Sequence, residues 1–166
     1  MFRGIRTTLD SYGRHNFTKT HAPALRSKGR PLPPMDEPVG YSEQLSELRE
    51  HFLAVCQPSE REENMQAVDI LQECYSNRYD GIDSELHVSF AWLYRLPEPF
   101  LDRLQARDAT TLVIYAHFVV LIYEMERFWY LKGWTHHIMG GIYEALATEH
   151  IAWIRWAMAR VGWIAP

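Results

Sequence analysis

An apolar run in the second half of the chain is the sequence feature that most limits the fold. From Leu112 to Tyr123 every side chain is apolar or aromatic except that of His117. The run is much shorter than the about twenty residues that a membrane-spanning helix needs, so it predicts a helix buried inside a protein. A chain of 166 residues is long enough to surround such a helix within one domain.

Apolar residues recur at helical spacing through most of the remaining chain. No stretch of six residues shows the two-residue alternation of a half-buried strand. We therefore predict an all-α fold, a single compact helical domain of about six to seven helices with a long buried central helix. Besides a short N-terminal helix, the expected helices lie near residues 42–55, 59–75, 97–104, 108–131, 135–146 and 150–162.

The first forty residues differ in composition from the rest. A short helix is predicted within residues 2–12, and residues 13–40 hold five prolines and three glycines, which indicates a long irregular segment. The Lys and Arg residues between Arg3 and Arg30 are typical of a solvated surface. The alternative is a basic arm or a weak organelle-targeting peptide. We thus expect one domain over 1–166, in which residues 1–40 precede a helical core at 41–166.

Charge, cysteines and motifs argue against several functions. A net charge of −4 offers no overall attraction to nucleic acid or anionic lipid. Cys56 and Cys74 belong to no Cys-x-x-Cys motif and predict two buried, reduced thiols in an intracellular protein, cytoplasmic or nuclear. Motifs for hydrolysis, phosphoryl transfer and nucleotide-linked redox chemistry do not occur in the sequence. We expect no cofactor, no metal and no membrane span.

His117 is the one residue in the apolar run whose ordinary pKa lies near neutral pH. The positions three and four residues before and after it hold Val, Ile, Val and Leu, so no second metal ligand lies one helical turn away. Glu124 shares its helical face but lies roughly 10 Å along the axis. One interpretation is a neutral imidazole hydrogen-bonded inside the protein. The other is a proton donor or acceptor that faces a ligand cavity.

Two further groups of polar residues invite a chemical interpretation. His136 and His137 point about 100° apart on a helix, so they cannot chelate one ion there, and one of them is expected to face inward. The segment 80–87 holds Asp80, Asp83, Glu85 and His87. It could form an acid–base cluster, although an acidic solvated loop explains it with fewer assumptions.

Aromatic residues are concentrated in the second half of the chain. All six tryptophans lie within residues 90–163, and residues 128–134 carry bulky rings at consecutive positions. Such rings point in several directions from a helix end, so they cannot all enter one core. They can close a pocket, form a dimer interface or simply pack between helices.

Several of these aromatic motifs occur in a defined order. They are Phe90-Ala91-Trp92 with Leu96-Pro97 and Phe100-Leu101, then Leu112 to Phe118, then Trp129-Tyr130-Leu131-Lys132-Gly133-Trp134 with His137, and finally Trp153-Ile154-Arg155-Trp156. Together with Phe2-Arg3-Gly4-Ile5, the series resembles the C-terminal regulatory domain of fungal binuclear zinc-cluster transcription factors. The sterol uptake regulator group is the most similar type.

The resemblance implies an all-helical domain that can form a homodimer and that contains a hydrophobic cavity. In the sterol-responsive members this cavity takes a sterol. The six-cysteine DNA-binding module of the family is missing from the sequence, so this chain alone is not expected to bind nucleic acid. Because Met1 falls just before the Phe-x-Gly motif, we expect a shortened relative that kept a lipophilic cavity and lost its DNA-reading half.

The expected function is binding of a lipophilic, polycyclic small molecule, of sterol, terpenoid or polyketide type, in an aromatic-lined cavity. The alternative is a cofactor-free cyclase or isomerase of fungal secondary metabolism, with His117 or His137 and Tyr115 or Tyr123 as acid–base residues. The predicted ligand-binding residues are Trp92, Tyr115, His117, Phe118, Phe128, Trp129, Trp134 and His137.

Overall fold

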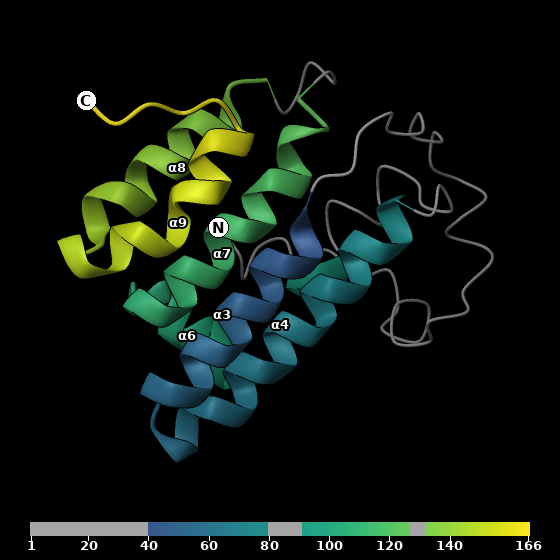
Figure 1. Cartoon of the computed structure of the whole chain (residues 1–166), viewed down its shortest axis with the longest axis vertical. Helices are drawn as coiled ribbons and strands as arrows, with labels where there is room; N and C mark the ends of the chain where they lie inside the picture. The colour runs from purple at the N-terminus through teal and green to yellow at the C-terminus, as the bar shows by residue number, and fades with distance from the viewer. Residues whose placement is uncertain (1–39, 80–90, 127–131) are drawn as a thin grey trace.

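The computed structural model describes residues 40–79, 91–126 and 132–166 (Figure 1). These residues form helices and turns without any strand, which confirms the predicted all-α fold. The predicted helix at 2–12 and the loop at 80–89 lie outside the described residues. The labelled helices are α3 (Tyr41–Val55), α4 (Pro58–Tyr79), α6 (Glu98–Gln105), α7 (Ala109–Tyr123), α8 (Trp134–Ala145) and α9 (Thr148–Arg160).

Helix α7 lies at the centre of the described part. Every residue from Thr111 to Ile122 is buried. Helices α4, α6, α8 and α9 all pack against it, with the α8–α9 pair and the α3–α4 pair on different sides (Figure 1). Because neighbours surround α7, its sequence needs no polar face and can be apolar almost throughout. The predicted buried central helix is confirmed.

Three helix starts follow rules that can be read from the sequence. The side chain of Asp108 accepts a hydrogen bond from the backbone N–H of Thr111 and caps α7. Pro99 lies in the first turn of α6, where a missing N–H costs nothing. Pro58 is the first residue of α4 and separates this helix from α3.

The end of α7 differs from the prediction. We expected the helix to reach about Leu131 and to stop at Gly133, but α7 ends at Tyr123. Gly133 instead adopts a left-handed conformation, with φ of 81°, immediately before α8. The carboxylate of Glu126 accepts a hydrogen bond from the backbone N–H of Thr135, 2.7 Å away, at the start of α8. The tertiary contact with α8 therefore accounts for the turn at this point.

Two smaller predictions can also be compared with the structure. Cys56 and Cys74 are both buried, as expected, and neither belongs to a disulfide. Within the described ranges, no single helix is long and apolar enough to cross a membrane. Among the helices that the structure describes, one neighbouring pair, α6 and α7, reaches that length and hydropathy when taken together, and the two helices are bent by 97° relative to each other.

Candidate functional site

Three of the predicted ligand-binding residues pack against one another in the core. The ring centroid of Trp92 lies 4.6 Å from that of Phe118 and 6.2 Å from that of Tyr115. Phe100 meets Trp92 edge-on at 6.0 Å, and the indole N–H of Trp92 donates to the carbonyl of Ala67 at 2.8 Å. Burial raises the pKa of the Tyr115 phenol. These rings fill the space between α4, α6 and α7.

Other predicted site residues lie near the surface. Tyr123, at the end of α7, is 40% exposed, and Trp134, at the start of α8, is 43% exposed. His137 on α8 is exposed as well. Phe128 and Trp129 lie outside the described residues, as does the polar group at 80–87.

The adjacent histidines of α8 do not behave as predicted. Helix α8 buries Thr135, Met139 and Ile142, and neither His136 nor His137 lies on that buried face. His136 still has a defined partner, because its Nε2 lies 2.9 Å from the carbonyl oxygen of Val161. The expectation that one of the two rings faces inward was therefore wrong.

His117 is buried, and one of its ring nitrogens is bonded to the backbone. Nδ1 lies 2.9 Å from the carbonyl oxygen of Val113, one turn earlier in α7. A carbonyl can only accept, so Nδ1 carries the proton and Nε2 of the neutral ring is an acceptor. The ring also stacks on Trp156 of α9, with centroids 5.6 Å apart and planes inclined by 11°. Burial lowers the pKa of His117 to about 4, so the ring is neutral at pH 7.

His117 lines a pocket between α3 and α9, which we call the α3–α9 pocket. Helix α7 supplies His117, the most deeply buried polar residue of the lining, and we call this part of the pocket its floor. The side chains of Gln44 and Glu47 are hydrogen-bonded to each other at the exposed rim. The pocket has a volume of about 160 Å³ and is lined by Gln44, Glu47, Leu48, His117, Ala152 and Trp153.

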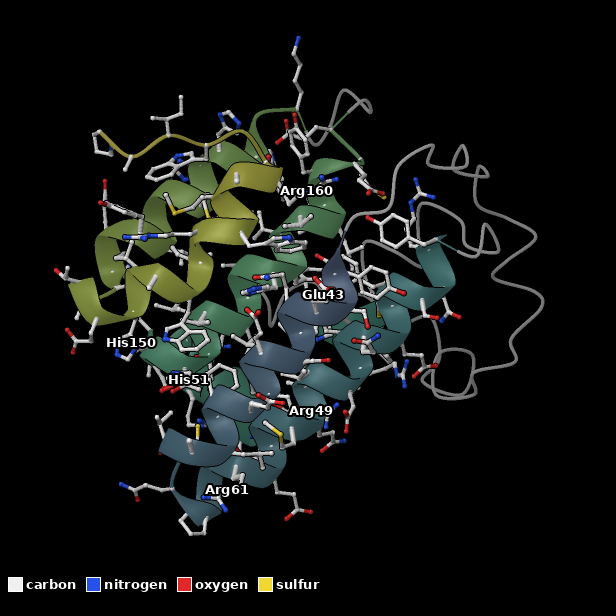
Figure 2. The ribbon with its side chains drawn as sticks, in the orientation of Figure 1. Glu43, Arg49, His51, Arg61, His150 and Arg160 are labelled. Atoms are coloured by element: carbon white, nitrogen blue, oxygen red, sulfur yellow. The ribbon has the colours of Figure 1, made fainter. Side chains whose placement is uncertain are left out.

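One wall of the α3–α9 pocket is held by a second histidine. The ring of His51 on α3 stacks on that of Trp153 on α9, with centroids 3.7 Å apart and planes inclined by 20°. His150 of α9 lies on the same side of the molecule as His51 (Figure 2). Burial and the nearby His150 lower the pKa of His51. The stacked pair joins the two helices and fixes the position of the indole in the wall.

Sequence reasoning identified His117 but not most of its neighbours in the α3–α9 pocket. Leu48 was recognisable only as part of the apolar face of a helix, and Trp153 only as part of a motif. Gln44, Glu47 and Ala152 carry no signal of their own, because each is an ordinary residue at the edge of a helix. They become a site only because α3 and α9, which are distant in sequence, lie over the same part of α7.

We expect the stability of the protein to fall as the pH is lowered from 6.5 to about 4. In the unfolded chain His117 takes up its proton near the ordinary pKa of 6.5, whereas in the folded protein it does so only near 4. Its contribution to stability is therefore complete above pH 6.5 and is lost progressively down to pH 4, by about 3 kcal/mol in total.

Urea unfolding across this pH range measures the effect. The variant His117→Gln cannot titrate, so its stability should decline less steeply between pH 6.5 and 4 than that of the unaltered protein. Equal declines in the two proteins would contradict this account of His117.

Comparisons with known proteins add nothing to these observations. Neither the scan of protein families nor the searches of curated proteins and solved structures found a match. The resemblance to fungal regulatory domains stays a prediction from sequence motifs.

Proposed function

We propose that this domain binds a lipophilic small molecule in the α3–α9 pocket. The observation that carries the proposal is the second nitrogen of a buried imidazole. Val113 occupies Nδ1 of His117, and no other described residue makes a hydrogen bond to its Nε2. Nε2 of the neutral ring is an acceptor, so a molecule in the pocket can donate a hydrogen bond to it.

Three of the six lining residues offer apolar surface to a guest. Leu48, Ala152 and Trp153 contribute hydrocarbon and aromatic surface around His117. Covering apolar ligand surface contributes about 25 cal/mol per Å² and is offset by the lost freedom of the ligand. The remaining polar groups, at the rim and the floor, can fix its orientation.

The volume limits how much of a ligand can enter. About 160 Å³ is less than the roughly 300–1,000 Å³ of pockets that enclose drug-sized ligands. A polycyclic molecule of the expected kind would place one ring inside and leave its other rings at the surface beside α9. The part of the ligand that is recognised is therefore small.

Binding is a better account of this geometry than catalysis. A cyclase or isomerase needs a second acid or base within reach of the reacting atoms. The other candidates for that role were Tyr115, Tyr123 and His137, and none of them lines the α3–α9 pocket. The carboxylate of Glu47 does line it, but at the exposed rim, where it is hydrogen-bonded to Gln44 and not beside His117. We therefore propose that His117 acts as a hydrogen-bond partner of the ligand.

The substitution Ala152→Leu tests the proposal. Ala152 is exposed on α9, and leucine is nearly as good a helix former as alanine, so the fold should be kept while the pocket is filled. With toluene and cholesterol as probes, we expect binding to weaken by about tenfold or more, as steric exclusion from the site predicts. Ligand-observed NMR titrations measure it.

A matched control comes from the same helix. Ala159→Leu introduces the same side chain at another exposed position of α9, and Ala159 does not line the pocket. This variant should bind both probes as the unaltered protein does. If Ala152→Leu binds the probes as tightly as the unaltered protein does, the proposed function is wrong.

A further inference from the structure

The backbone determines whether the free ring nitrogen of His117, at the floor of the pocket, donates or accepts a hydrogen bond. The carbonyl of Val113 holds the proton of His117 on Nδ1, 2.9 Å away. Moving this proton to Nε2 would break that bond and bring two lone pairs face to face, so the other neutral tautomer is disfavoured. A guest that reaches Nε2 must therefore donate a hydrogen bond. Ethers and ketones cannot do so, whereas a hydroxyl or an N–H group can.

The charge of the lining disfavours ionised guests. Burial keeps the pKa of His117 at about 4, so the floor carries no positive charge at neutral pH. The charged side chain of the lining is Glu47, whose carboxylate lies at the exposed rim beside Gln44. A carboxylate in the pocket would lose its hydration without meeting a cation and would also face Glu47. An ammonium group would likewise lose its hydration at the floor, away from the rim.

The size and shape of the pocket favour one flat ring. Its volume of about 160 Å³ is close to that of an apolar cavity of about 150 Å³ that takes a benzene molecule. The indole of Trp153 forms part of the wall and is held by its stack on His51. Aromatic rings favour offset-stacked or edge-to-face contacts with such a surface. A single aromatic ring can fill the space beside Trp153 and point one substituent at His117.

On the basis of the proposed function, we infer that the α3–α9 pocket selects a neutral phenol, either a free small phenol or the phenolic ring of a larger lipophile. The ring lies against Trp153, and its hydroxyl donates a hydrogen bond to Nε2 of His117. The ligand class is set by one backbone carbonyl, that of Val113, which determines which ring nitrogen of His117 can accept.

The test compares four ligands of nearly equal shape on the unaltered protein at neutral pH. They are p-cresol, its methyl ether 4-methylanisole, toluene, and 4-methylbenzoate. We expect p-cresol to bind about tenfold more tightly than toluene and than 4-methylanisole, because only p-cresol can donate a hydrogen bond. Ligand size alone cannot produce this order, since toluene is smaller than p-cresol and 4-methylanisole is larger. We expect 4-methylbenzoate to bind more weakly than toluene. Isothermal titration calorimetry gives the affinities.

A spectroscopic measurement locates the hydrogen bond. The ¹⁵N resonances of the imidazole of His117 report which nitrogen is protonated and which accepts. We expect the Nε2 resonance to shift on addition of p-cresol and to remain in place with toluene. The variant Ala152→Leu should abolish the shift, and the matched variant Ala159→Leu should keep it.

The outcomes separate this inference from the proposed function. If p-cresol, toluene and 4-methylanisole bind equally and Ala152→Leu weakens all three, the pocket binds lipophiles but does not select phenols, and only the inference is overturned. If cholesterol and all four single-ring ligands fail to bind, both are overturned. Tighter binding of p-cresol with no change at Nε2 would also overturn the inference.

Discussion

Replacing Glu124 by glutamine is expected to lower the free energy of unfolding by about 3 kcal/mol, because it leaves a buried arginine without its charge partner. Nε of Arg78 lies 2.7 Å from one carboxylate oxygen of Glu124, and the two side chains are only 3% and 12% exposed. The hydroxyl of Tyr79 donates to the other oxygen at 2.7 Å. Together these bonds tie α4 to the residue that follows α7.

The matched control is Glu73→Gln. Glu73 forms an ion pair with Arg95 at 2.6 Å, but these side chains are 34% and 28% exposed, so water can take the place of the lost partner. We expect a loss of at most about 1 kcal/mol there. Urea unfolding followed by circular dichroism measures both variants. Equal losses would mean that burial does not decide the strength of these pairs.

The second large effect is expected from Trp92→Ala, which should cost about 4 kcal/mol of stability. The side chain is fully buried, and its ring stacks on that of Phe118. Its indole N–H also donates to the carbonyl of Ala67 in α4. The substitution removes the ring from the centre of the core together with this hydrogen bond between the indole and α4.

Trp134→Ala is the control for this change, because the same side chain is removed at a position that is 43% exposed. We expect a loss of about 0.5 kcal/mol or less there. Thermal unfolding of the two variants gives the comparison. A small loss for Trp92→Ala would indicate that the cluster around Trp92 is loosely packed and can hold a ligand after all.

The position of Trp92 also shows what an aromatic cluster in a sequence leaves open. Trp92, Tyr115 and Phe118 were predicted to line a cavity. An aromatic cluster in a sequence can equally well form a pocket wall or a packed core. Periodicity indicates which face of a helix is buried, but not whether a ring or an empty space lies opposite. In the structure, the rings lie opposite one another.

His117 was the part of the candidate site that could be recognised in advance. A single imidazole among apolar residues must be neutral, or paired, to be buried, and this follows from the chemistry of the residue alone. Which nitrogen is bonded, and what the other one faces, depends on Val113 and on the α3–α9 pocket. The sequence therefore predicted the residue and left both of its roles open.

The sequence alone determined the helices, the buried position of α7 and the cap at Asp108, because these depend on local propensity and on the spacing of apolar residues. The tertiary structure decided the early end of α7, the packed cluster around Trp92 and the pocket beside His117. Each of these requires contacts between segments that are distant in the chain. A periodic pattern records that a face is buried, but only the folded structure determines what it is buried against.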